Sequence, residues 1–170
     1  MDILEAVRKR RSIRSFKKKE IPEELIDKLT ESLVWAPSAG NLQSRKFYFI
    51  RDEAVKRKVA EAALNQGFIA DAPLVIVGCT DSHVAGKYGE RGVTLYSIQD
   101  VACSIMAMML VAFDNKLGTC WVGAFREEEL TRILNLPMNL KPVVIIPVGY
   151  PSKIPPPPRR VSREEAVEFR

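Results

Sequence analysis

The sequence predicts an α+β or α/β protein, and three observations support this class. The chain has 170 residues, 46% of them hydrophobic and 28% charged, which is enough to bury the core of one domain. Helical apolar patterns are mixed with four short apolar segments of strand length. There is no internal repeat, and the one low-complexity stretch is the run of prolines at 155–158. We expect a single domain over residues 1–170, with an extended proline-rich arm at 151–170.

Two helices are predicted before the first strand. Residues 2–10 form a short amphipathic helix pattern, and Pro22 opens a second pattern that stops at Pro37. Their apolar residues are Ile3, Leu4 and Val7 in the first, and Leu25, Ile26, Leu29, Leu33 and Val34 in the second. We expect the apolar faces of both helices to lie against the core.

The next part of the chain predicts two strands separated by a helix. The strands are expected at 46–50 and 74–79, and the helix at 54–65, closed by Gly67. Residues 74–79 form a continuous apolar run that ends in Gly78 and Cys79, so we expect this strand to be covered on both faces.

Residues 97–116 predict a long helix that is apolar on every side. Ser97 and Asp100 form an N-terminal capping pair, Gly118 stands where the helix should end, and residues 101–113 include a single polar residue. A domain of this size can hardly cover such a helix alone. We therefore expect a partner subunit to cover it, the alternative being complete coverage by its own sheet and neighbouring helices.

The last third of the chain predicts two strands and two helices. Strands are expected at 119–122 and 143–148, and Pro147 favours an edge position or a bulge for the second. A helix is expected at 127–134, and a capping box at 162–165 opens a terminal helix.

Basic residues are concentrated near the N-terminus. The net charge is +5, and residues 8–19 include eight basic residues and no acidic one. Within five residues, Arg10, Arg11, Ser12 and Arg14 supply three guanidiniums and a hydroxyl that could hold a phosphate by bidentate hydrogen bonds. A solvated surface or a nucleic-acid patch is the alternative, although these segments lack interleaved aromatic residues for base stacking.

The cysteines and the single histidine give no sign of a metal site. Cys79, Cys103 and Cys120 are odd in number, widely spaced and set among apolar residues, so we expect buried thiols in the reducing cytoplasm. His83 lies in a polar loop, where we expect an exposed position. No segment approaches the roughly 18 uninterrupted apolar residues of a membrane span, so none is expected.

The chain resembles the FMN-dependent nitroreductase family through five segments in the family's order and spacing. These segments are 10–16, 36–43, 96–102, 118–125 and 149–151. The resemblance extends from residue 10 to residue 167 and implies a short, single-domain member. It implies an α+β sandwich of helices around a four-stranded mixed or antiparallel sheet, which a strand from the partner subunit could complete. It also implies a homodimer with an FMN at each of two interface sites.

The resemblance further implies a set of cofactor contacts. They are Arg10, Arg11, Ser12 and Arg14 at the phosphate and ribityl chain, Pro37, Ser38, Ala39, Asn41 and Gln43 in a loop over the flavin of the opposite subunit, Gln66 at the pyrimidine edge, Val122, Gly123 and Ala124 along the flavin edge, and Arg159 and Arg160 from the C-terminal arm. Arg160 is the closer match of the two arm residues, and Pro158 replaces a lysine usual in the family. Arg45 also departs from the family pattern, so it either changes the rim of the pocket, attracts an acidic substrate, or lies on the surface.

The activity implied by the resemblance is that of an oxidoreductase using NADH or NADPH. In a ping-pong reaction, the nicotinamide delivers hydride to flavin N5 and leaves, and a nitroaromatic, quinone or similar acceptor then takes the electrons. No side chain is expected to act as an obligatory acid or base, and Tyr88 and Arg91 are expected on the substrate side. The alternatives are specialised flavin chemistry such as dehalogenation or flavin fragmentation, FMN binding without catalysis, and a basic nucleic-acid-binding module.

Overall fold

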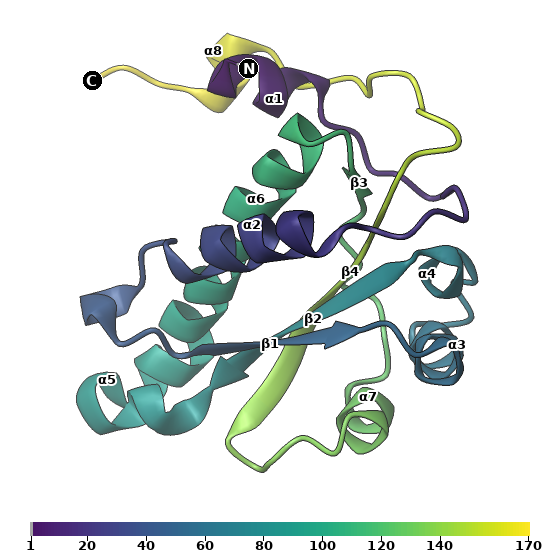
Figure 1. The fold of residues 1–170 in the computed structure, drawn as a ribbon. Helices are drawn as coiled ribbons and strands as arrows, with labels where there is room; N and C mark the ends of the chain where they lie inside the picture. Colours follow the sequence, from purple (N-terminus) through teal and green to yellow (C-terminus); the bar gives the residue numbers. More distant parts are fainter. Residues whose placement is uncertain (1) are drawn as a thin grey trace.

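A computed structural model describes residues 2–170 and places a four-stranded antiparallel sheet at the centre of an α+β fold (Figure 1). The strand order is β1-β2-β4-β3. The strands are β1 (Arg45–Ile50), β2 (Leu74–Asp81), β3 (Gly118–Thr119) and β4 (Leu140–Gly149). The fold class and the four-stranded sheet predicted from the sequence are therefore confirmed.

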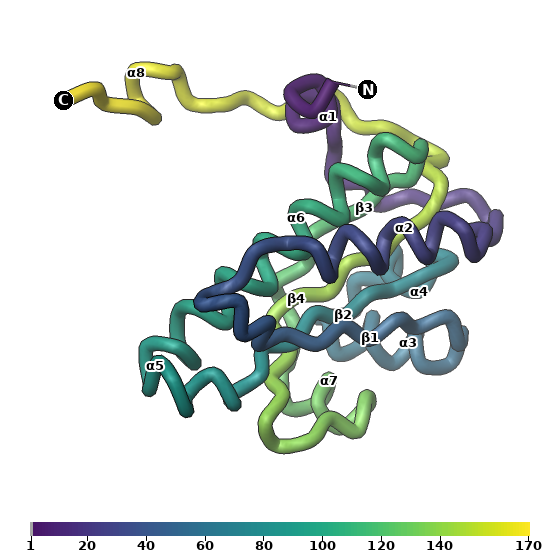
Figure 2. The backbone as a smooth tube through the Cα atoms, turned by 60° about the vertical axis from the view of Figure 1, so that its left-hand side comes forward, coloured from purple at the N-terminus to yellow at the C-terminus, as the bar shows by residue number. Residues whose placement is uncertain are grey.

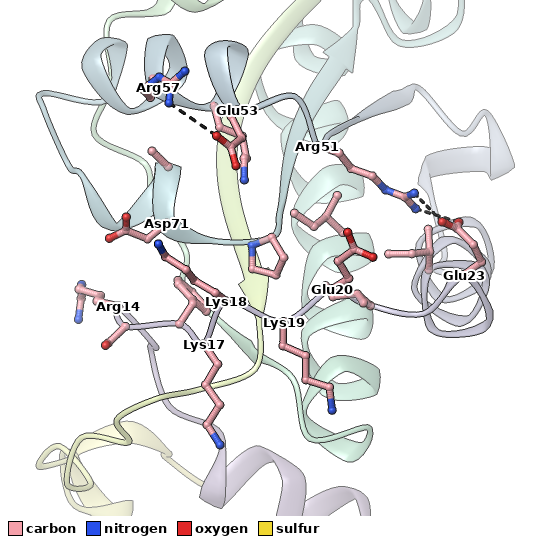
Figure 3. A pocket seen from close by; sticks show the side chains of 18 residues that line it. Arg14, Lys17, Lys18, Lys19, Glu20, Glu23, Arg51, Glu53, Arg57 and Asp71 are labelled. Atoms are coloured by element: carbon pink, nitrogen blue, oxygen red, sulfur yellow. Dashed lines mark hydrogen bonds and ion pairs between the residues drawn. The ribbon is translucent and has the colours of Figure 1, made fainter.

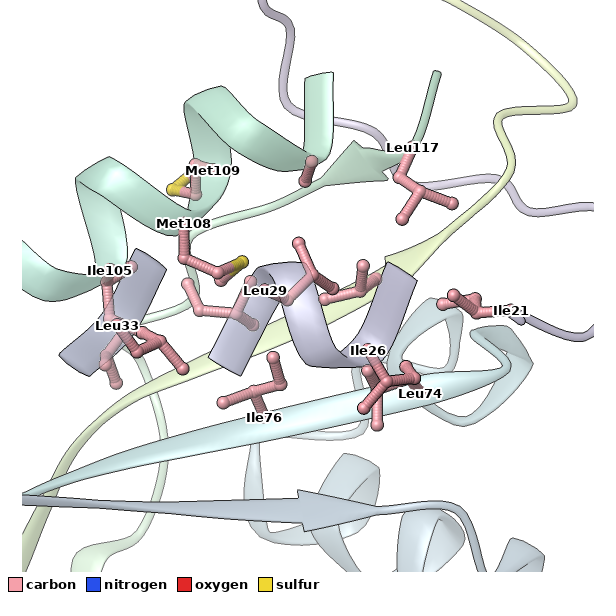
Figure 4. Packing of buried hydrophobic residues seen from close by; sticks show 14 of the residues in the cluster. Ile21, Ile26, Leu29, Leu33, Leu74, Ile76, Ile105, Met108, Met109 and Leu117 are labelled. Atoms are coloured by element: carbon pink, nitrogen blue, oxygen red, sulfur yellow. The ribbon is translucent and has the colours of Figure 1, made fainter. Parts of the chain in front are cut away.

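One face of the sheet packs against two helices, α2 (Glu23–Val34) and α6 (Ser97–Asp114). Alternate residues of β2, such as Leu74 and Ile76, point into this layer beside Leu29 and Met108 (Figure 4). The apolar stripe predicted on α2 is confirmed at Ile26, Leu29 and Leu33, is partly buried at Leu25, and is wrong at Val34, whose side chain is exposed at the end of the helix.

The other face of the sheet packs against three shorter helices, α3 (Glu53–Ala62), α4 (Phe68–Asp71) and α7 (Glu127–Ile133). Val75 and Val77 of β2 point into this second layer. Residues 74–80 are buried throughout, which confirms that this strand is covered on both faces.

Two predicted positions near α3 and β4 are wrong. The helix ends at Ala62 rather than at Asn65, because Leu64 and Asn65 both adopt a positive φ, and Gly67 instead precedes α4. Pro147 is not on an edge strand, since β4 lies between β2 and β3. The side of Pro147 that lacks an N–H faces β3. The pairing between β3 and β4 is interrupted there, between Thr119 and the Val122–Ile145 bridge. The proline therefore leaves the hydrogen bonds between β4 and β2 intact.

The long helix differs from its prediction at both ends. Short helix η2 (Ser82–Val84), α5 (Ala85–Arg91) and π-helix η3 (Gly92–Tyr96) lead directly into α6, so the helix does not begin at a capping pair. Ser97 Oγ donates to Val93 O within the helix, and Asp100 binds a different segment. Gly118 is not the helix terminator either, because α6 ends at Asp114 and Gly118 opens β3.

The surface of α6 is only partly covered by this chain. Val101, Ile105 and Met108 are buried in the core, whereas Ile98 keeps 43% of its surface exposed and Cys103 is exposed. The stretch Ser82–Asp114 is long and apolar enough to span a membrane by length and composition, but 44% of its most apolar window is buried inside the protein. Its packing on α2 and the sheet is that of a core helix.

The two ends of the chain lie away from the core. Helix α1 (Ile3–Lys9) buries only Ala6 among its apolar residues, so the predicted core-facing stripe is wrong: Ile3, Leu4 and Val7 are all largely exposed. The arm after Pro151 projects from the body of the protein and ends in α8 (Arg163–Ala166), which starts at the predicted capping box (Figure 2).

Candidate functional site

The predicted phosphate-binding residues run alongside β3 at one end of the molecule. Ile13 N–H donates to Thr119 O at 2.9 Å, and Ser12 and Thr119 form a parallel bridge. Gly118 permits this contact, because a Cβ there would lie 2.5 Å from Ile13 Cγ1. We call residues 10–14, together with Cys120 and Arg160, the arginine end.

Arg10 is the least satisfied side chain of the arginine end. Its Nε is buried and has no hydrogen-bond partner in residues 2–170. Burial lowers the pKa of Arg10, and the nearby charges of Arg160 and Arg11 lower it further. None of the ion pairs within the described chain includes Arg10, Arg11, Arg14 or Arg160. The arginine end therefore concentrates positive charge with no carboxylate to neutralise it.

The other members of the arginine end have distinct contacts. Arg11 Nη1 donates to Arg8 O and Arg10 O at 2.7 and 2.8 Å, so this guanidinium caps α1. Arg14 lies 5.9 Å from the centroid of the Phe68 ring. Burial raises the pKa of the Cys120 thiol. The charge of Arg14 and a hydrogen bond with Ser12 lower this pKa, but their effect is smaller than that of burial.

The segment predicted to follow the flavin edge is joined to Gln66. Gln66 Nε2 donates to Ala63 O at 2.8 Å and to Ala124 O at 3.2 Å. Val122 is held to Ile145 of β4 by two hydrogen bonds of 3.0 Å. Gly123 and Ala124 are exposed, and their N–H groups have no acceptor within residues 2–170. These donors are therefore free to bind a ligand.

The predicted loop over the flavin has a fixed backbone at the opposite end of the molecule. Gly40, Asn41 and Gln43 all have φ near +54°, which requires the left-handed region at three positions. Ala39 N–H donates to Asp100 Oδ1 at 2.9 Å, and Ser38 Oγ accepts from Gln43 N–H at 3.0 Å. We call residues 36–43, together with Asp100 and Arg45, the loop end.

Arg45 anchors the loop end rather than facing a pocket. Its guanidinium donates to the carbonyls of Val34 at 3.1 Å, Ala36 at 2.6 Å and Pro37 at 3.0 Å. Burial lowers the pKa of Arg45, opposed by the charge of Asp100. Because its donors are engaged with the last turn of α2 and the start of the loop, Arg45 does not lie free on the surface, and its attraction for an acidic substrate stays a prediction.

The two ends do not share one cavity within a single chain. Asp100 lies in the first turn of α6 and Thr119 follows its last turn, and 18 helical residues span about 27 Å. Figures 1 and 2 both place residues 36–43 and β3 at opposite ends of α6. A crevice beside Arg10 holds about 40 Å³, far below the roughly 300–1,000 Å³ of pockets for small molecules.

A separate cleft of about 1020 Å³ lies between residues 14–26 and the elements α3 and α4 (Figure 3). Arg14 is its single lining residue from the predicted cofactor contacts. Its lining has seven basic and four acidic side chains, and two of the acidic ones, Glu23 and Glu53, form ion pairs with arginines. This mixed charge is a poorer match to a phosphate than the arginine end.

The cysteine prediction is correct for two residues. Cys79 and Cys120 are buried free thiols, and burial raises the pKa of Cys79 to about 12. Cys103 is wrong as a buried residue, because it lies on the uncovered face of α6. His83 is exposed as predicted, with Nδ1 2.8 Å from Asp81 Oδ1, and residues 2–170 contain no cluster of metal ligands.

Sequence reasoning missed three residues that the fold adds to these two ends. Cys120 belongs to the arginine end, the Phe68 ring lies against Arg14 of that end, and Asp100 joins the loop end across 61 residues of sequence. The signal for Asp100 was present, because a carboxylate at an apolar helix is a backbone acceptor more often than a catalyst. The residues around Asp100 in the sequence do not indicate that it accepts the N–H of Ala39 instead of an N–H of its own helix.

Comparisons with known proteins link most of the chain to one family. The model of the nitroreductase family matches residues 7–81 and 61–150. A protein of Methanothermobacter thermautotrophicus provisionally named NADH dehydrogenase/NAD(P)H nitroreductase is 33% identical over 159 residues, covering 91% of this chain and 80% of the relative. An FMN reductase (NADPH) of Bacillus subtilis is 26% identical over 165 residues, covering 89% and 66%. The solved structure of B. megaterium NfrA2 has a TM-score of 0.92 at 26% identity, covering 99% and 74%.

Proposed function

The chain belongs to the nitroreductase family, as an NAD(P)H-dependent oxidoreductase with FMN as its cofactor, and we propose that two copies together build its active site. Each site combines the arginine end of one subunit with the loop end of the other. When bound by these residues, FMN would supply two-electron redox chemistry between NADH or NADPH and a nitroaromatic, quinone or similar acceptor, in a ping-pong cycle.

One observation carries the assignment of the cofactor phosphate to the arginine end. A buried guanidinium nitrogen of Arg10 lacks a partner, and the neighbouring charges of Arg160 and Arg11 are positive. Such a site is electrostatically costly alone and is relieved by a dianionic phosphate. The charge of Arg160, and not that of Arg159, is among the causes that lower the pKa of Arg10, which favours Arg160 as the phosphate contact from the arm.

The remaining predicted contacts have matching chemistry. Ser12 and Arg14 lie close to Cys120 together with Arg10 and would hold the phosphate and ribityl chain, while Gln66 donates to Ala124 O and would present its amide to the edge of the ring. The exposed N–H groups of Gly123 and Ala124 would donate to the ring where negative charge develops on reduction. Positioning by these groups is sufficient, so no side chain is assigned as acid or base.

Three features support a second subunit at this site. The loop end and the arginine end are separated by the length of α6, and a twofold axis would bring one of each together. The crevice beside Arg10 is too small to enclose a flavin. Apolar side chains are exposed where a partner would lie, including Ile98 at 43%, Ile3 at 74% and Phe169 at 81%. The unpaired cysteines are consistent with a reducing cytoplasmic location.

The test is the visible spectrum and mass of the purified, FMN-reconstituted protein. We expect a yellow dimer whose flavin band is bleached anaerobically by NADH or NADPH and restored by a nitroaromatic or by menadione. Bleaching without recovery by either acceptor would favour the specialised flavin chemistry or the non-catalytic binding protein. A colourless monomer would refute the proposal.

A pair of variants tests the shared site directly. Ile98→Arg places a charge on the uncovered face of α6 and should yield a monomer that no longer retains FMN. Met138→Arg changes a fully exposed residue in the segment between α7 and β4 and should leave both the dimer and the bound FMN intact. Loss of the dimer with full retention of FMN would show that one subunit binds the cofactor alone.

A further inference from the structure

A compact group of aromatic and basic side chains lies on α5 and η3, next to the loop end. Tyr88 and Tyr96 pack edge to face, with ring centroids 5.3 Å apart and planes at 88°. Arg91 Nε donates to Tyr96 Oη at 2.9 Å, and the guanidinium carbon lies 5.4 Å from the Tyr96 centroid. Lys87 Nζ lies 5.4 Å from the Tyr88 centroid. We call Lys87, Tyr88, Arg91 and Tyr96 the tyrosine–cation cluster.

The π-helix explains how the tyrosine–cation cluster forms. Arg91 and Tyr96 are five residues apart, and in a regular α-helix such a pair does not face the same side. The wider turn of η3 (Gly92–Tyr96) brings positions five apart onto one face, and single π-turns of this kind are frequent at functional sites. The irregular helix thus places the Arg91 guanidinium on the Tyr96 ring.

The tyrosine–cation cluster touches the loop end at Gly40. A Cβ at Gly40 would lie 2.3 Å from Tyr88 Oη and 3.1 Å from Lys87 Nζ. The tyrosine hydroxyl and the lysine ammonium therefore lie directly on the backbone that precedes Asn41. If the loop end borders the flavin of the partner subunit, the tyrosine–cation cluster borders the same cavity.

The two positive charges of the cluster have no acidic partner in the part of the chain that the structure describes. None of the ion pairs within residues 2–170 includes Lys87 or Arg91, and both side chains belong to exposed residues. Arg91 uses Nε for Tyr96, which leaves its two terminal nitrogens for another acceptor. Stacking on the tyrosines restricts both cations and lowers the entropy lost when they bind an anion.

We propose that the tyrosine–cation cluster recognises the anionic group of a planar aromatic substrate. This inference rests on the proposed function and names the substrate class of that same site. Tyr88 and Tyr96 offer an aromatic surface to the ring of the substrate, and Lys87 and Arg91 bind its anionic group. The anionic group is either a carboxylate on the aromatic ring of the electron acceptor or the 2′-phosphate on the adenosine ribose of NADPH, which NADH lacks.

The test measures discrimination between charged and neutral substrates in the double variant K87Q/R91Q. With NADH fixed, kcat/KM is compared for 4-nitrobenzoate and the neutral 4-nitrobenzyl alcohol. With menadione fixed as acceptor, kcat/KM is compared for NADPH and NADH. We expect either the ratio of 4-nitrobenzoate to 4-nitrobenzyl alcohol or the ratio of NADPH to NADH to fall about tenfold, which is the size expected for one lost charge-assisted contact. The comparison that changes identifies the source of the anion.

A charge-matched control and a cofactor measurement separate the outcomes. The variant K28Q/K58Q removes two exposed lysines from α2 and α3 and should leave both ratios unchanged. If both ratios in K87Q/R91Q stay within twofold of the unmodified protein, the inference is overturned. Flavin content and bleaching by NADH are measured in the same preparations. If the proposed function is wrong, bound flavin and bleaching by NADH are missing from the unmodified protein as well. If only this inference is wrong, both are present in the unmodified protein.

Discussion

The arginine end and the loop end each leave one buried charged atom, Arg10 Nε and Asp100 Oδ2, without a partner within residues 2–170, but only the loop end binds its arginine internally. At the loop end, Arg45 donates to three carbonyls and Asp100 accepts the N–H of Ala39. At the arginine end, Arg10 has a buried nitrogen without a partner and positive neighbours. The difference separates two uses of the same residue type, because a satisfied arginine supports the fold and an unsatisfied one is available to a ligand.

The largest effect is expected from removing the internal support of the loop end. Arg45→Met leaves three carbonyls without their charged donor, and we expect the free energy of unfolding to fall by about 2–4 kcal/mol. Urea denaturation of the cofactor-free protein measures this loss. Arg51→Met removes the exposed pair with Glu23 at the other end of β1 and should cost less than about 1 kcal/mol. Equal losses in the two variants would contradict the role given to Arg45.

A substitution at the arginine end should weaken FMN binding and leave the stability of the cofactor-free protein unchanged. Arg10→Gln should weaken FMN binding by about 10- to 100-fold, because charge-assisted hydrogen bonds contribute roughly 1.5–3 kcal/mol. Its cofactor-free stability should not fall, since Arg10 makes no ion pair within residues 2–170 and is repelled by Arg160. Quenching of flavin fluorescence measures the affinity, and Arg8→Gln, on the exposed face of α1, is the control. A stability loss with unchanged affinity would make Arg10 a structural residue like Arg45.

The support beneath the arginine end comes from close packing rather than from charge. A Cβ at Gly118 would meet Ile13 at 2.5 Å and Pro151 at 2.9 Å, so Gly118→Ala should lower the free energy of unfolding by about 1–3 kcal/mol. It should also shift the 10–14 segment and weaken FMN binding. Gly67→Ala is the matched control, because no atom lies within 4 Å of the added Cβ. Thermal melts of the two variants that coincide would disprove the close contact.

The effect that is smallest at neutral pH, because it appears only above pH 9, concerns the sheet between the two ends. Burial raises the pKa of Cys79 from 9.0 to about 12, so the folded state keeps this proton while the unfolded chain loses it above pH 9. Stability present below pH 9 is then lost as the pH rises toward 12, by about 1.4 kcal/mol per unit. Cys79→Ala should remove this part of the alkaline slope, and Cys103→Ala, at an exposed site, should retain it. Denaturation midpoints between pH 8 and 11 provide the comparison.

The sequence predicted the elements that depend on local patterns. The buried strand around Val75 and the capping box at Ser162 were both correct, because apolar runs and caps are decided by neighbours in sequence. Gly118 and Pro147 were recognised as special but given the wrong reason. Gly118 makes room for Ile13, and Pro147 faces a gap in the ladder, and both contacts join distant segments.

The amino-acid sequence by itself predicted the α+β class and the nitroreductase family, which are confirmed, and a set of residues suited to an anionic cofactor, which stays a prediction. Only the tertiary structure decided that Arg45 and Asp100 hold the loop, and that Lys87 and Arg91 lie on two tyrosines beside Gly40. The physical reason is that a residue's type fixes the bonds it can make, whereas its partner depends on chain segments brought together by burial of the core.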